Sequence, residues 1–152
     1  WVGTRDSGLY QFHPRSKEFK HYRNQVNVPS SLSDASVWAI TDDNQGNLWI
    51  GTDMGLNKFD MKMKQFSHYH RQENDLNSLS SDSITSIARD SQGNIWIGTH
   101  DGLNQFNPIN EQFMHYRHQA NDSNRLTVNY IQRITEDRLG KHLLGTSGRL
   151  AQ

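Results

Sequence analysis

A repeat of 47 residues constrains this chain more than any other feature of its sequence. The string WVGT at Trp1–Thr4 returns 48 residues later as WIGT at Trp49–Thr52, and then at intervals of 47 as WIGT at Trp96–Thr99 and weakly as LLGT at Leu143–Thr146. The extra residue lies in the turn after Thr4. Further identical residues keep the spacing of 47, at Leu9, Leu56 and Leu103, at Phe12, Phe59 and Phe106, and at His21, His68 and His115. Self-similarity at a period of roughly 20–50 residues indicates one supersecondary unit stacked on copies of itself.

Each unit has the sequence pattern of four short strands separated by turns. The unit that begins at residue 36 predicts strands over 37–42, 48–52, 56–59 and 65–70, with a tight turn at Asp43–Asn47 in which Gly46 supplies a positive φ. The second strand is a continuous apolar run around Trp49, so we expect both of its faces to be covered. We also expect the Trp49 and Trp96 rings to be buried between neighbouring units.

Four-stranded units of this length predict an all-β protein made of β-propeller blades with four antiparallel strands. Helical repeats of similar length would show a 3.6-residue periodicity, which the sequence lacks. We expect about three blades plus remnants, divided into a three-strand remnant (1–24), two blades (36–71 and 83–118) and a two-strand remnant (129–146). In the last unit, either the turn before Gly148 is shorter or Arg149 replaces the repeat glycine.

An open arc of blades would leave apolar faces uncovered at both ends, which favours aggregation. Propellers close with roughly 4–8 blades. We therefore expect the chain to be part of a six- to seven-bladed ring, either as a homo-oligomer, most simply a dimer that completes the ring, or as a segment of a longer propeller chain. A start at Trp1 in place of Met also suggests a segment of a longer protein.

Composition excludes several classes of function. Lys and Arg number 16 and so do Asp and Glu, so no charge excess points to nucleic acid. The chain has no cysteine, which rules out disulfides and thiolate metal sites. No stretch approaches the ~20 apolar residues of a membrane-spanning helix, so we expect no membrane insertion by this segment.

Two motifs resemble metal sites, and both have a simpler structural explanation. The histidines at 47-residue spacing would lie on different outer strands around a ring, too far apart to share a metal ion. Asp42–Gly46 resembles a calcium loop, but the alternating positions before the Gly, which should hold Asp or Asn, are Thr41, Asp43 and Gln45, and this favours a capped turn. We therefore predict no metal site and no cofactor.

The segment Ile40–Asp60, with Gly46, Trp49 and Gly51 at its centre, resembles the two-component regulator propeller repeat, and it recurs as 87–107. In that family the repeats build seven-bladed propellers in the periplasmic sensor part of membrane-bound bacterial regulators, including hybrid histidine kinases and diguanylate cyclases. The known ligands of the better-understood members of that family are oligosaccharides. The resemblance thus implies a periplasmic, ligand-sensing segment of a signal-transduction regulator. The motif is structural, so it carries over no catalytic residue.

Propeller ligands usually bind at the mouth of the central channel, where loops of every blade converge. Residues that differ between the copies at these positions are the ones a binding site could use. Trp and Tyr stack on sugar faces, and Asp, Arg and Gln bond hydroxyls, which suits an oligosaccharide or another small ligand. The candidates are Arg5, Asp6, Asp53, Met54, His100 and Asp101 in the turns, and Trp38, Thr85, Tyr130 and Gln132 on the inner strands.

Two other functions stay open. The chain could be a protein-interaction platform that uses the broad face of the ring. It could also be an enzyme similar to streptogramin lyases, propellers that use a His and a Glu for elimination, but the available glutamates fall mostly near outer strands and connectors. These are Glu18, Glu73, Glu111 and Glu136. We predict that the chain is not an enzyme.

Overall fold

The computed structural model describes residues 1–119, 122, 126, 128–146 and 150–151, which form fourteen β-strands and no helix. The first sheet contains β1 (Val2–Gly3), β2 (Leu9–His13) and β3 (Glu18–Tyr22). The second contains β4 (Val37–Asp42), β5 (Asn47–Thr52), β6 (Gly55–Asp60) and β7 (Gln65–Tyr69). The third contains β8 (Ile84–Arg89), β9 (Ile95–Thr99), β10 (Gly102–Asn107) and β11 (Gln112–Tyr116). The last contains β12 (Ile131–Glu136), β13 (His142–Thr146) and β14 (Leu150–Ala151).

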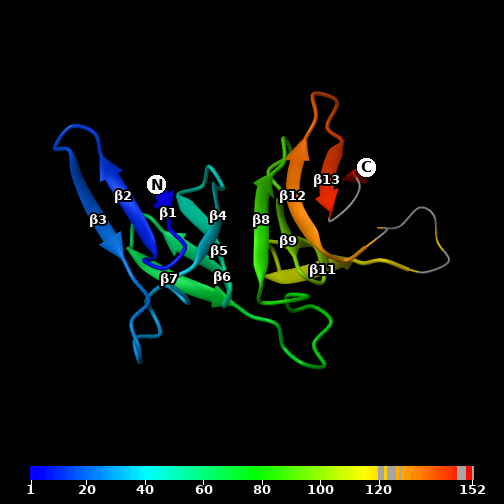
Figure 1. Ribbon diagram of the computed structural model, residues 1–152, viewed down its shortest axis with the longest axis horizontal. Coiled ribbons are helices and arrows are strands. Elements are labelled where there is room, and N and C mark those ends of the chain that lie inside the picture. The colour runs from blue at the N-terminus through cyan, green and yellow to red at the C-terminus, as the bar shows by residue number, and fades with distance from the viewer. Residues whose placement is uncertain (120–121, 123–125, 127, 147–149, 152) are drawn as a thin grey trace.

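Every sheet is an antiparallel meander in which consecutive strands pair, as the repeat predicts. Figure 1 shows the sheets following one another from the first on the left to the last on the right. The edge strands β4, β8 and β12 contact one another in that order and form the inner wall of the arc. The described part of the chain contains no helix of the length and apolarity that crossing a membrane requires.

An aspartate fixes the turn between the first two strands of each unit. The Asp43 carboxylate accepts hydrogen bonds from the backbone amides of Gln45 and Asn47, from Asn47 Nδ2 and, at 3.3 Å, from Trp49 Nε1. Asp90 repeats this pattern in the third sheet. Burial opposes the change, but these bonds from Asn47 and its neighbours lower the pKa of Asp43 overall. The turn predicted as capped is therefore held by a charged acceptor.

The core of the molecule lies between the sheets, because each sheet covers the next. Three buried clusters occupy the three successive joints. The second strand β5 is buried along almost its whole length, as its continuous apolar run predicts. Gly51 allows the close approach, since a Cβ at that position would lie 2.4 Å from Ile84 Cγ2 of the next sheet. The same contact is made by Gly3 with Val37 and by Gly98 with Ile131.

A buried polar network fastens each connector to the blade that follows it. Asn57, which is fully buried, accepts a bond from the Ser33 amide and donates one to Ser33 Oγ. Ser33 Oγ also contacts Thr52 Oγ1 at 2.9 Å. Ser80, Thr99 and Asn104 form the same network in the third sheet. Because every polar group has a partner, the network can be buried at little cost.

Two expectations need correction. The last sheet has a third strand, β14, whose Leu150 pairs with Gly145 and stands 47 residues after Leu103, where the repeat places a third strand. The turn before it, including Gly148 and Arg149, lies outside the described residues. The Trp49 ring is buried with 2% exposure as predicted, but Trp96 is only half-buried. Phe106 packs on Trp49, and the equivalent position for Trp96 is 153, which the 152 residues of this sequence do not include; the last sheet presents His142 to Trp96.

Candidate functional site

A β-bulge interrupts the innermost strand of three successive sheets. The pairing register shifts between Val37 and Ala39, and again at the equivalent positions of β8 and β12. The extra residues are Trp38, Thr85 and Gln132, which keep the 47-residue spacing. A bulge redirects a side chain out of the regular alternation of its strand. Each inner strand thus presents one side chain that differs between the copies at the same level of the inner wall.

These three side chains meet in one cleft across β4, β8 and β12. Its volume is ≈ 410 Å³, within the range of ~300–1,000 Å³ that is typical of small-molecule sites. Six of the ten candidates predicted from the sequence line this inner-wall cleft, together with Ile84, namely Trp38, Asp53, Thr85, His100, Tyr130 and Gln132. Residues almost 100 positions apart in the chain therefore form one concave surface.

An indole held by a carboxylate forms one side of the inner-wall cleft. Trp38 is 48% exposed, and its Nε1 donates a hydrogen bond to Asp53 Oδ1 at 2.8 Å. Val37 pairs with Thr52, so the bulge brings Trp38 directly beside the turn that starts at Asp53. An exposed indole that is fixed in one orientation is a stacking platform for a flat or weakly polar ligand face.

The other side of the cleft joins the third and last sheets. The His100 and Tyr130 rings lie 4.8 Å apart between centroids, and they approach from the end of β9 and the start of β12. Thr85 Oγ1 donates a hydrogen bond to the backbone carbonyl of Ile131. Both contacts cross the joint between two sheets, so the shape of the cleft depends on how these sheets pack.

The other four candidates do not line the inner-wall cleft. Arg5 and Asp6 are exposed in the first turn, and Asp6 belongs to a second cleft. Met54 is 55% exposed beside the connector of its own blade. Asp101 is occupied by an ion pair with Arg117 at 2.9 Å and by a bond from Asn129 Nδ2. Of the six candidates in the turns, Asp53 and His100 line the inner-wall cleft; both are the first residue after the repeat Thr.

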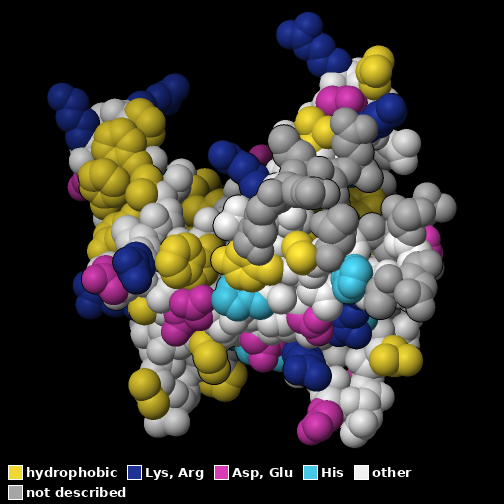
Figure 2. Space-filling model, turned by 45° about the vertical axis from the view of Figure 1, so that its right-hand side comes forward, with side chains coloured by type: hydrophobic (Ala, Val, Ile, Leu, Met, Phe, Trp, Pro, Cys, Tyr) yellow, Lys and Arg dark blue, Asp and Glu magenta, His cyan; other side chains and the backbone are white. Residues whose placement is uncertain are grey.

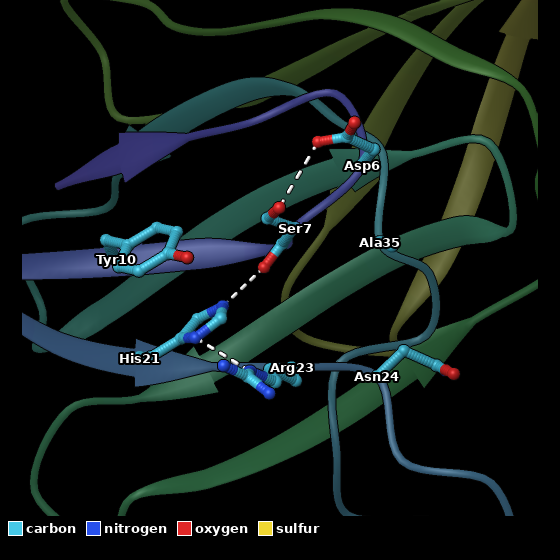
Figure 3. A pocket seen from close by; sticks show the side chains of 7 residues that line it. All are labelled: Asp6, Ser7, Tyr10, His21, Arg23, Asn24 and Ala35. Carbon is cyan, nitrogen blue, oxygen red and sulfur yellow. Dashed lines mark hydrogen bonds between the residues drawn. The ribbon is translucent and has the colours of Figure 1, made fainter.

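The second cleft, of ≈ 380 Å³, lies on the first sheet and is drawn in Figure 3. The Tyr10 and His21 rings stack with centroids 3.9 Å apart, and Arg23 Nε donates to His21 Nδ1 at 2.7 Å. His21 Nε2 bonds the backbone carbonyl of Ser7. The sequence analysis did not predict this cleft.

Equivalent positions in the next blades are covered by a connector. His68 Nε2 contacts the Ser31 carbonyl at 2.8 Å, and His115 Nε2 contacts the Ser78 carbonyl at 2.6 Å. Tyr10 stands where those blades have Asn57 and Asn104, the residues that bind the connector serines. The second cleft is thus the place that a connector takes on the other blades, and the inner-wall cleft is the better candidate for a ligand site.

The outer-strand histidines serve the fold, as predicted. His68 binds the connector carbonyl, and burial lowers its pKa, although the bond to Ser31 acts in the opposite direction. The His68 and His70 rings lie 6.0 Å apart between centroids. Across the residues that the structure describes, no group of three or more His, Asp or Glu side chains is placed to hold a metal ion.

Comparison with known proteins supports the repeat assignment. The family model of the two component regulator propeller matches residues 31–54 and 78–101. No curated protein matches the chain.

Solved structures give the same fold. The extracellular domain of BT4673 from B. thetaiotaomicron, described in one structure as a one component system and in another as a hybrid two component system, is 28% and 26% identical, with TM-scores of 0.75 and 0.74. Each alignment covers 95% of this chain and 18% of that one, so the chain spans less than a fifth of these relatives.

PorZ, a surface component of the type-IX secretion system of Porphyromonas gingivalis, shares the fold at 14% identity and a TM-score of 0.59, over 97% of this chain and 29% of its own length. The predicted propeller fold is therefore confirmed. Two segments of the chain, in its second and third sheets, are therefore similar to the two component regulator propeller repeat that the sequence resembles.

Proposed function

We propose that this chain is a ligand-sensing segment of a bacterial two-component regulator and that its inner-wall cleft binds an oligosaccharide. The observation that carries the proposal is the convergence of variable residues from three repeats on one cleft, with the exposed Trp38 ring at its side. Asp53, Thr85 and Gln132 add the polar groups that bond sugar hydroxyls. The neighbouring BT4673 structures are extracellular domains, which supports a periplasmic location for this segment.

Binding without catalysis fits the placement of the glutamates. A lyase mechanism of the streptogramin type needs a Glu beside a His, and His100 is the histidine of the inner-wall cleft. Glu111 accepts a bond from the Tyr69 hydroxyl, and Glu136 accepts two from Ser91. No glutamate is among the described residues that line the cleft.

Calorimetric titration of the chain with a panel of neutral trisaccharides tests the proposal. Trp38→Ala should weaken binding by roughly tenfold, because a lost aromatic anchor costs more than about 1 kcal/mol at a binding hot spot. Met54→Ala is the matched control, since Met54 is equally exposed but lies outside the cleft. If the panel does not bind, or if both variants bind equally well, the inner-wall cleft is not a saccharide site, and a protein-interaction platform becomes the better hypothesis.

We further propose that the arc is completed into a ring by a second copy or by further blades of a longer parent. Phe12 and Phe19 are 41% and 62% exposed, whereas their repeat equivalents Phe106 and Phe113 are buried against the preceding sheet. Figure 2 shows hydrophobic side chains gathered at the left, where Figure 1 places β2 and β3. Light scattering should find the isolated chain self-associated; a cooperatively folded monomer would contradict this proposal.

A further inference from the structure

The inner-wall cleft has an unusual charge distribution for so polar a chain. Asp53 is its only carboxylate, and no lysine or arginine is among the described residues that line it. The second cleft, by contrast, combines Asp6 with Arg23. The inner-wall cleft thus offers a ligand the negative charge of Asp53, whereas the second cleft offers one charge of each sign.

Basic residues near the inner-wall cleft are directed elsewhere. Arg117 lies beside the turn that carries His100, but its Nη2 pairs with Asp101 Oδ2 at 2.9 Å and its Nε donates to the Asp101 carbonyl. Arg133 follows Gln132 directly and pairs with Gly145 of β13, but it does not line the cleft. Neither guanidinium contributes to the lining of the cleft.

The Asp53 carboxylate keeps one oxygen for a ligand. Oδ1 accepts the Trp38 indole N–H, which fixes both side chains. Oδ2 has no hydrogen-bond partner among the described residues, so it can accept a bond from a ligand hydroxyl beside the indole face. A negative group of the ligand at the same place would face this oxygen with no lysine or arginine of the described lining to offset the repulsion.

We propose that the inner-wall cleft selects uncharged saccharides and rejects acidic ones, with Asp53 as the residue that discriminates. This inference rests on the proposed function of the cleft. Repulsion between like charges is a common way to exclude a competing ligand of similar shape. The Trp38 platform supplies contact area to both kinds of saccharide, so the charge of the ligand decides between them.

The test uses matched pairs of probes that share one sugar backbone and differ in whether their carboxyl groups are charged or methyl-esterified. Trimers of galacturonate, glucuronate and mannuronate are titrated into the chain by calorimetry, each against its fully methyl-esterified form. The chain should bind at least one ester about tenfold or more tightly than the corresponding acid, since like charges in contact at an interface are strongly unfavourable. The discrimination should fall as salt is raised, because the Debye length shortens from ~10 Å at 0.1 M to ~3 Å at 1 M.

Asp53→Asn separates charge from shape. The amide oxygen still accepts the Trp38 N–H, so the platform stays in place while the charge is lost. The difference between ester and acid should then narrow to about twofold. Asp101→Asn is the matched control, because it removes a carboxylate outside the cleft and should keep the full discrimination.

The outcomes distinguish this inference from the proposed function. If neither the esters nor the neutral trisaccharides bind, the proposed function fails. If an ester and its acid bind equally well, or if Asp53→Asn leaves the discrimination unchanged, the cleft binds saccharides but Asp53 does not select among them.

Discussion

Around its tryptophan, the joint between the second and third sheets is apolar, whereas the joint between the third and last sheets is partly polar. In the first joint Trp49 is almost fully buried, with its ring 4.7 Å from Phe106 and 5.8 Å from Tyr69 between centroids. In the second joint the equivalent Trp96 is half-buried, and its ring lies 4.5 Å from His142. The repeat keeps the tryptophan but changes what it packs against.

The polar joint replaces part of its apolar contact with hydrogen bonds. Glu136 accepts bonds from the amide and the hydroxyl of Ser91, which lies in the turn of the preceding sheet. His142 stands where the third sheet has Ile95, and its buried Nε2 has no hydrogen-bond partner, with Asp90 Oδ2 at 3.7 Å. One repeat can therefore build joints of unequal strength. The inner-wall cleft extends across both joints, so the weaker one is the place where a ligand could most easily change the packing of the sheets.

Removal of each tryptophan should have the largest effect and tests the comparison directly. Trp49→Ala should cost about 3–5 kcal/mol of the free energy of unfolding, the usual cost of emptying a buried aromatic site. Trp96→Ala should cost less, because its ring is only half-buried and leaves a smaller cavity. Urea unfolding followed by far-UV circular dichroism measures both losses. Equal losses would show that the two joints do not differ in strength.

A methyl group at the repeat glycine should have the next largest effect. Gly51→Ala places a Cβ 2.4 Å from Ile84 Cγ2, so the joint must open, at a cost of about 1–3 kcal/mol. Gly145→Ala is the control at the same repeat position, because the heavy atom nearest to its new Cβ would be 3.6 Å away, an ordinary contact distance. Chemical denaturation should find the control close to the unchanged protein. A Gly51→Ala variant of unchanged stability would refute close packing at this joint.

Much of the fold could be predicted, because the 47-residue spacing repeats the structural residues without interruption. Asp43, Gly51 and Trp49 each recur with the same role, so one correct strand assignment applies to every unit. The contact of Trp96 with His142 could not be predicted, since His142 stands where the preceding unit has Ile95 and breaks the pattern. The spacing does indicate that the position equivalent to Phe106, which covers Trp49, is 153 and lies outside this sequence.

The site could be predicted in part, because residues that vary between copies are free of the structural role. Trp38, Asp53 and His100 were predicted as candidates on this ground, and the structure places them in one cleft. It failed for Asp101, which pairs with Arg117 through a contact that neither spacing nor composition reveals. The bulges that direct Trp38 and its equivalents into the cleft also have no signature in a single sequence.

Replacement of the half-buried His142 imidazole should sharpen the comparison by making the second joint resemble the first. His142→Ile restores the residue type of Ile95 and removes a polar atom that has no hydrogen-bond partner. We expect a gain of about 1 kcal/mol at neutral pH, since burying an unsatisfied polar group costs at least that much. Thermal and urea unfolding measure it. A loss of stability would mean that the contact of His142 with Trp96 or Asp90 outweighs the buried nitrogen.

Protonation of the turn aspartates in acid should lower the free energy of unfolding, and this is the smallest effect that we expect. Although burial acts against it, bonds from Asn47 and its neighbours lower the pKa of Asp43, and Asp90 is lowered in the same way. A lowered pKa means that the charged carboxylate favours the folded state, so its contribution is complete above the unfolded pKa of ~3.9 and is lost as pH falls through the folded pKa. Urea unfolding should show that the free energy of unfolding falls between about pH 5 and pH 3, the range around the ordinary pKa of Asp. Asp43→Asn should make this fall smaller. Asp137 is the equivalent residue of the last sheet, where Leu143 stands in place of the tryptophan. Among the described residues it accepts two backbone bonds, from Leu139 and Lys141. Asp137→Asn should therefore reduce the acid-induced loss of stability less than Asp43→Asn does. An equal reduction by both variants would show that the bond from Trp49 adds nothing to the turn.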